Sequence, residues 1–133
     1  MTRAAFTHPV RVYYEDTDAA GVVYYANYLK FMERARTEWL AARGASVAEL
    51  AGHGSIVFVV TRAEVEFRAP ARLGDLLAVG VDVAAHGRAR FVARQDIRRG
   101  DELVVAATIT LACVDRNTFK PRRMPANLLE PHT

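Results

Sequence analysis

Apolar and polar residues alternate along most of this chain, with one long interruption where the period changes. Near the N-terminus, Val10, Val12 and Tyr14 alternate with Arg11 and Glu15. A two-residue period is typical of a half-buried strand, because successive side chains point to opposite faces. We therefore expect a first strand in this segment, with Tyr14 facing the interior.

The interruption is a segment with the period of a helix. From Asn27 to about Arg43 the apolar residues recur every three or four positions, and Gly44 follows as a C-terminal stop. Asn27 stands where an N-terminal cap is expected. The pattern predicts one long amphipathic helix with an apolar face of Tyr28, Phe31, Met32, Ala35, Trp39 and Leu40.

After the helix the two-residue period returns and predicts four further strands, over residues 63–67, 77–83, 89–97 and 105–113. Short connections with glycine, such as His86-Gly87 and Arg99-Gly100-Asp101, favour antiparallel hairpins. The predicted class is α+β, with one helix against a curved five-stranded antiparallel sheet, in a single domain over residues 1–133.

One helix cannot cover both faces of such a sheet, so the outer face is either solvated or buried by another subunit. The near-continuous apolar run from Ile56 to Val60 favours another subunit. We expect a homodimer or homotetramer, with a ligand cleft between subunits.

The composition of the chain limits the kinds of ligand that it is expected to bind. The chain has 133 residues, 51% hydrophobic, with 16 arginines and 2 lysines against 15 acidic residues and a formal net charge of +3. The basic residues are scattered among acidic ones, whereas a nucleic-acid binder more typically has a basic stripe, so no nucleic acid is expected. The densest basic positions, Arg98-Arg99 and Lys120 to Arg123, suit a small phosphorylated ligand.

The numbers and positions of cysteine and histidine bear on whether the chain forms a disulfide or binds a metal. Cys113 is the single cysteine, so no internal disulfide can form and a cytoplasmic protein is expected. The first residues lack a signal-peptide core and no run of about 18 apolar residues occurs, so we expect no membrane insertion. His8, His53, His86 and His132 have no metal-ligand spacing. We expect no metal and no cofactor.

The segment between the first strand and the helix carries the candidate chemistry. Glu15, Asp16 and Asp18 end the extended run, and Gly21 permits a tight bend before the helix. A carboxylate and a helix N-terminus are thereby brought together. From the residues alone, the simpler interpretation is that these acids only cap the helix or interact with its dipole.

A resemblance to a known family makes a catalytic role the preferred interpretation of Asp18. The segment EDTDAAGVVYYANYLKFMERART, residues 15–37, resembles the hotdog-fold acyl-CoA thioesterases, especially the Tol-Pal-associated YbgC type and the 4-hydroxybenzoyl-CoA thioesterases. The resemblance extends over nearly the whole chain. It implies a long helix wrapped by a curved antiparallel sheet, paired subunits and an active site at the subunit interface.

The resemblance also implies roles for three residues. The family's catalytic aspartate falls on Asp18, and the tyrosine that accompanies it in the YbgC type falls on Tyr14. Tyr25 stands where the YbgC type usually carries histidine, and matches the 4-hydroxybenzoyl-CoA enzymes, in which the backbone amide at this position polarises the thioester carbonyl. The family histidine's role as a general acid therefore does not carry over.

Thioester hydrolysis needs a nucleophile or base, and donors for the oxygen that becomes negative. Asp18 can attack the carbonyl to form a mixed anhydride, or act as general base on water; the sequence leaves both open. Candidate contacts for coenzyme A phosphates are Arg98, Arg99, Lys120, Arg122 and Arg123, with solvated surface charge as the alternative.

Hydrolysis of acyl-CoA to free acid and coenzyme A is thus the leading hypothesis. A hydroxyacyl dehydratase would need a catalytic histidine, and none lies in the loop or helix. The second alternative is a non-catalytic module that binds acyl-CoA or acyl-carrier protein, against which the intact Asp18 argues.

Overall fold

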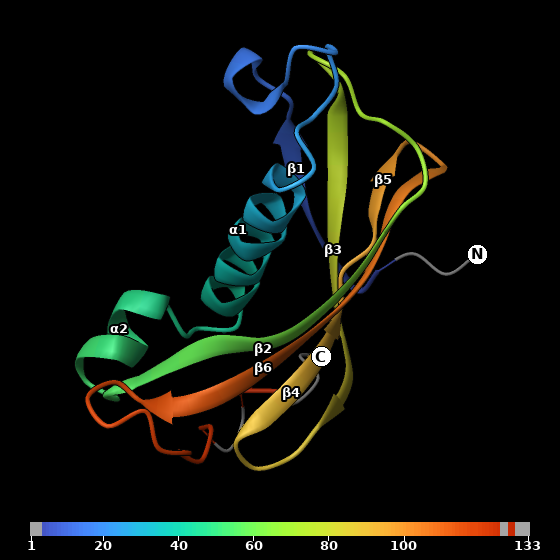
Figure 1. Ribbon diagram of the computed structural model, residues 1–133. Coiled ribbons are helices and arrows are strands. Elements are labelled where there is room, and N and C mark those ends of the chain that lie inside the picture. The colour runs from blue at the N-terminus through green and yellow to red at the C-terminus, as the bar shows by residue number, and fades with distance from the viewer. Residues whose placement is uncertain (1–3, 126–127, 130–133) are drawn as a thin grey trace.

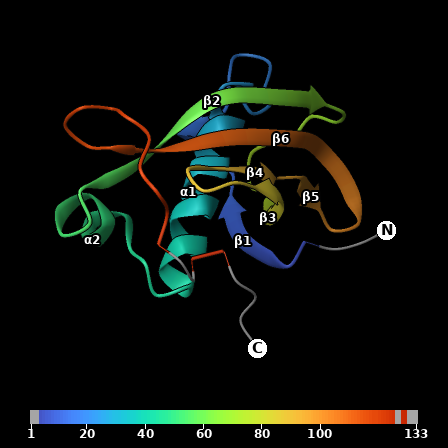
Figure 2. The same ribbon diagram turned by 90° about the horizontal axis from the view of Figure 1, so that it is seen from below.

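The computed structural model describes residues 4–125, 128 and 129. Within them, a six-stranded antiparallel sheet curves around one long helix, α1 (Figures 1 and 2). This confirms the α+β class. The strands are β1 (Phe6–Arg11), β2 (Ile56–Phe67), β3 (Leu76–His86), β4 (Arg90–Arg94), β5 (Ile97–Arg99) and β6 (Glu102–Asp115); the helices are α1 (Asn27–Ala42) and α2 (Val47–Gly52), with a 3₁₀ turn over Tyr14–Asp16.

The strand order is β1-β3-β4-β6-β2, and β5 pairs with β3 and β6. The expected hairpins are confirmed, because β4 pairs antiparallel with β3 and β6 pairs antiparallel with β5. Strand β2 lies at one edge of the sheet among the described strands and includes the apolar run from Ile56 to Val60. Val60 and Phe67 of this edge strand are about half exposed (48% and 50%).

Helix α1 has the predicted extent. Its inner face is fully buried, with Phe31, Met32 and Ala35 at 0% exposure against the sheet. At its C-terminus Gly44 adopts φ +80°, and the N–H of Ala45 donates to the Leu40 carbonyl at 2.9 Å. This left-handed glycine termination confirms the predicted stop.

The start of α1 differs from the prediction. Ala26 is the N-cap residue and Asn27 is the first helical residue, so Asn27 does not cap the helix. Its side chain instead binds the preceding loop, as described below. The reason is that the loop already places a carbonyl acceptor within reach of the Asn27 amide.

The first strand was also placed wrongly. It spans Phe6–Arg11 rather than the segment up to Glu15, and Tyr14, expected to face inward, is 82% exposed. The backbone N–H of Tyr13 donates to Asp16 Oδ2 at 2.8 Å, and this local side-chain bond replaces a strand hydrogen bond. The alternation of residues 10–15 therefore continues past the end of the strand.

Two elements were missed. The predicted strand over residues 89–97 is two strands, β4 and β5, separated by the fully buried Gln95 and by Asp96, so the described part of the chain forms a sheet of six strands rather than five. Helix α2 was not predicted. Its Ser46 side chain accepts a hydrogen bond from the N–H of Glu49 at 3.1 Å, and Ser-x-x-Glu is the sequence signature that would have indicated this helix start.

Candidate active site

The loop between the 3₁₀ turn and α1 is a tight, hydrogen-bonded turn. Thr17 and Val23 form an isolated antiparallel bridge, and the N–H of Asp18 donates to the Val22 carbonyl at 2.9 Å. The N–H of Gly21 donates back to the Asp18 carbonyl at 2.9 Å, with Gly21 at φ +80°. Glycine adopts this left-handed conformation without the steric cost of a Cβ atom. The predicted bend at Gly21 is confirmed.

Asp18 stands at the first position of this turn, with its side chain exposed. Its Oδ1 accepts a hydrogen bond from the N–H of Ala20 at 2.9 Å. No hydrogen bond or ion pair from another described residue reaches Oδ2. The turn thus orients the carboxylate through one oxygen and leaves the other for a ligand or water.

Asp16 connects the loop to the helix. Its backbone carbonyl accepts hydrogen bonds from the Tyr24 N–H and from Asn27 Nδ2, each at 2.9 Å, while its carboxylate holds the N–H of Tyr13. Asp16 is buried, at 5% exposure, and its carboxylate bonds within the 3₁₀ turn rather than capping α1. No sequence pattern indicates that Asp16 joins the loop to the helix, because the group that accepts these hydrogen bonds is its backbone carbonyl, which every residue has.

The N-terminus of α1 presents unused donors. Among the described residues, no acceptor is found for the backbone N–H of Tyr25 or of Ala26. Free N–H groups at a helix start carry a partial positive charge. The Tyr25 ring is 61% exposed and lies against Tyr24 and Phe67, at centroid distances of 5.0 and 6.0 Å.

A groove of about 250 Å³ adjoins this helix start, lined by Val23, Tyr25, Tyr28, Phe67, Arg68, Ala69 and Pro70. The Tyr28 hydroxyl accepts a hydrogen bond from the N–H of Ala71 at 3.1 Å, and burial raises the pKa of the phenol. Tyr28 is therefore a neutral phenol whose hydroxyl holds the chain after β2 against α1.

Tyr14 lies on the outer side of the 3₁₀ turn. Its carbonyl accepts hydrogen bonds from the N–H and the hydroxyl of Thr17, at 3.1 and 2.8 Å. Its backbone thus supports the turn that carries Asp18, while its ring faces solvent. A catalytic role for the Tyr14 side chain stays a prediction.

The five basic residues proposed to bind coenzyme A fall into separate regions. Arg99 forms ion pairs with Asp75 and Glu102 and donates to the Pro70 carbonyl at 3.1 Å. These bonds to Glu102 and Asp75 raise the pKa of Arg99. Arg98 follows the alternation of β5 to the other face and lines a small cavity there with Asp82 and Asp96.

Lys120, Arg122 and Arg123 are exposed and follow the end of β6. Arg122 Nη1 pairs with Asp115 Oδ2 at 2.9 Å. In Figure 1 this segment lies at the opposite end of the molecule from the loop before α1. One chain therefore does not bring these three residues to Asp18, and their role in binding coenzyme A stays a prediction.

The described residues contain neither a metal-binding cluster nor a membrane-spanning helix. No group of three or more His, Cys, Asp or Glu side chains is arranged to hold a metal ion. No helix in the described part of the chain has the length and apolar character needed to cross a membrane.

Comparison with known proteins gives consistent matches. Residues 12–131 match the model of the thioesterase-like superfamily. The chain is 42% identical over 125 residues to the acyl-CoA thioesterase YbgC of Haemophilus influenzae, a match covering 94% of this chain and 92% of that protein. It is 30% identical to the 1,4-dihydroxy-2-naphthoyl-CoA hydrolase of a Synechocystis strain, with 95% and 90% of the two chains covered.

The fold is similar to solved structures as well. A probable thioesterase from Bartonella henselae superposes with a TM-score of 0.87 at 38% identity, covering 91% of this chain and all of the other. The family match over residues 12–131 includes α1 and the loop that carries Asp18.

Proposed function

This chain belongs to the thioesterase-like superfamily, and we propose that it is an acyl-CoA thioesterase, which converts acyl-CoA and water to a carboxylic acid and free coenzyme A. The observation that carries the proposal is the pairing, within one loop, of a carboxylate and a helix start: one carboxylate oxygen and two backbone N–H groups have no hydrogen-bond partner among the described residues. These are the two chemical requirements of acyl transfer.

In the proposed reaction the N–H of Tyr25 donates a hydrogen bond to the thioester oxygen. That oxygen becomes negative when the carbonyl carbon turns tetrahedral, and one such donor is typically worth about 3 kcal/mol of barrier. The Tyr25 N–H is suited to this because it uses no acceptor among the described residues. The helix dipole acts in the same direction.

Asp18 acts by one of two routes. In the first, its carboxylate oxygen bonds to the carbonyl carbon, the carbon–sulfur bond breaks to release thiolate, and water hydrolyses the resulting mixed anhydride. In the second, Asp18 accepts a proton from water as the water oxygen bonds to the carbon. In the first route the departing thiolate takes a proton from a water molecule; in the second the proton that Asp18 accepted passes to the thiolate, which regenerates the carboxylate.

We further propose that the site works in a homo-oligomer. The outer part of β2 is exposed on both faces and lies at the sheet edge among the described strands. Its Phe67 lines the groove beside Tyr25. A second copy seated on this edge would cover the groove and bury aromatic surface, which favours association.

The test is thiol release from a panel of short-chain, long-chain and aromatic acyl-CoA substrates. Asp18→Asn should lose most of its turnover, whereas Glu15→Gln, which removes an exposed carboxylate three residues away, should retain it. Full activity in Asp18→Asn would refute the mechanism. Absence of turnover by the wild-type protein on every acyl-CoA and acyl-carrier thioester would instead favour a binding module.

A further inference from the structure

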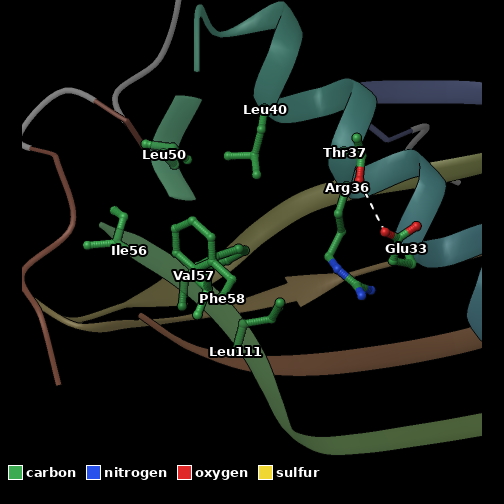
Figure 3. A pocket seen from close by; sticks show the side chains of 10 residues that line it. Glu33, Arg36, Thr37, Leu40, Leu50, Ile56, Val57, Phe58 and Leu111 are labelled. Atoms are coloured by element: carbon green, nitrogen blue, oxygen red, sulfur yellow. Dashed lines mark hydrogen bonds between the residues drawn. The ribbon is translucent and has the colours of Figure 1, made fainter. Parts of the chain in front are cut away.

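A second cavity lies deeper along α1, between this helix, α2 and the sheet. Its volume is about 130 Å³. Figure 3 shows its two unlike ends: Glu33, Arg36 and Thr37 lie at one, and Leu40, Leu50 and Ile56 lie toward the other. The remaining lining residues are Val57, Phe58, Phe91 and Leu111.

Arg36 is the unusual residue of this cavity. Its side chain extends from α1 toward the sheet (Figure 3) and is partly buried. Nη1 donates to Gln95 Oε1 at 2.8 Å, yet no ion pair joins Arg36 to a carboxylate of the described residues. Burial lowers the pKa of Arg36, and the nearby charge of Glu33 opposes this only in part.

Glu33 does not neutralise the guanidinium by direct contact. Its carboxylate is exposed and accepts the Thr37 hydroxyl at 3.4 Å, the dashed line of Figure 3. A partly buried charge without a contacting counter-charge is costly to the fold. The cost is reduced when a ligand supplies the opposite charge.

Gln95 holds the guanidinium in place. It is fully buried, its Nε2 donates to the Met32 carbonyl at 3.0 Å, and its backbone N–H donates to the Ala107 carbonyl at 2.9 Å. These two bonds fix the amide so that Oε1 faces Arg36. An oriented guanidinium whose other N–H groups meet no acceptor among the described residues suits a carboxylate, which it can bind through two parallel hydrogen bonds.

We propose that this cavity receives the distal end of the acyl group and that Arg36 selects acyl groups ending in a carboxylate. The inference rests on the proposed thioesterase function and specifies its substrate class as ω-carboxyacyl-CoA. Arg36 follows Asn27 by nine residues, about 14 Å along the helix axis, so only a long acyl group reaches the guanidinium, and sebacyl-CoA is the substrate expected to do so. One water occupies about 30 Å³ of liquid, so the cavity has room for only a few terminal atoms.

The test compares acyl-CoA pairs of equal length that differ only at the distal end. Adipyl-, suberyl- and sebacyl-CoA are assayed against hexanoyl-, octanoyl- and decanoyl-CoA, with kcat and KM measured separately. We expect the wild-type protein to prefer the carboxylate member of at least one pair. Arg36→Gln should lower kcat/KM for that substrate about 10- to 100-fold, from the loss of a charge-assisted hydrogen bond, and leave its methyl-ended partner within about twofold.

Arg34→Gln is the matched control, since Arg34 is an exposed arginine of the same helix; its substrate preference should equal that of wild type. Arg36→Lys keeps the charge without the planar fork and should restore part of the preference. If Arg36→Gln does not fold, the Lys variant and competition by free suberate against octanoyl-CoA still decide. Suberate should inhibit wild type more strongly than Arg36→Lys.

The inference is overturned if wild type shows no preference in any pair, or if Arg36→Gln slows both members of a pair equally, as a structural role alone would do. Failure of the thioesterase proposal has a different signature. In that case the wild-type protein hydrolyses neither member of any pair.

Discussion

Asn27 Nδ2 donates a hydrogen bond of 2.9 Å to the backbone carbonyl of Asp16. The two residues are 11 positions apart, and the bond closes the loop between them onto the first turn of α1. It therefore sets the position of Asp18 relative to the N–H of Tyr25.

Removing the side chain of Asn27 should loosen the loop without destroying the fold. For Asn27→Ala we expect a loss of about 1 kcal/mol in unfolding free energy and a fall in kcat of at least about tenfold, because small displacements of reacting groups are costly. Chemical denaturation and steady-state kinetics measure the two quantities. A stability loss with unchanged kcat would show that the closure does not position the site.

Gly21→Ala tests the turn itself. Because Gly21 has φ +80°, an alanine there should cost about 1–2 kcal/mol and reduce kcat by displacing Asp18. Gly52→Ala is the control: Gly52 lies in α2, and an added Cβ meets no atom within 4 Å. That variant should be at least as stable as wild type, since alanine favours helix, and fully active.

The backbone donor of Tyr25 can be separated from its side chain. Tyr25→Phe should retain activity, whereas Tyr25→Pro, which removes the N–H, should lower kcat about 100- to 1,000-fold. The proline removes no hydrogen bond found among the described residues. Equal activity of the two variants would exclude the N–H as the oxyanion donor, provided that circular dichroism shows both to be folded.

The Tyr28 hydroxyl has a structural role that a single substitution isolates. Tyr28→Phe keeps the buried ring but leaves the N–H of Ala71 without its acceptor, so we expect a loss of about 1–3 kcal/mol in unfolding free energy. Thermal or urea denaturation measures this loss. An unchanged stability would mean that water or a shifted backbone replaces the bond.

Asp75 makes the fold sensitive to acid. The backbone N–H of Arg72, with help from Arg99, lowers the pKa of Asp75 below its ordinary value. A lowered folded-state pKa contributes stability above the unfolded-state pKa of about 4, and that stability is lost as pH falls through the folded-state value. Unfolding free energy should thus decrease below about pH 4, and less steeply in Asp75→Asn. Identical slopes for the two proteins would contradict this.

Much of the fold was predictable because its signals are local. The extent of α1 follows from the spacing of residues such as Phe31 and Ala35, and its end from Gly44. The hairpins follow from short glycine connections, and the bend before α1 follows from Gly21. Asp18 and Tyr25 became candidates only through the family resemblance of residues 15–37, and their catalytic roles stay predictions.

Contacts between distant positions were not predictable in the same way. Tyr14 continues an alternating pattern yet is exposed, because Asp16 ends the extended backbone. The sequence predicts that Arg99 is available to bind a phosphate, yet in the fold it is paired with Asp75, 24 positions away. Its pairing depends on how the β5–β6 hairpin packs against the chain after β2.

By itself, then, the sequence determined the class of fold, the long helix and the loop that carries Asp18, since periodicity and glycine act on neighbouring residues. Only the tertiary structure decided which polar groups are used up and which are left free. Arg36 and Gln95 are 59 positions apart, and only the packing of α1 on the sheet brings them together. The same packing partly buries the charge of Arg36. At the other end of α1 the N–H of Tyr25 has no acceptor among the described residues.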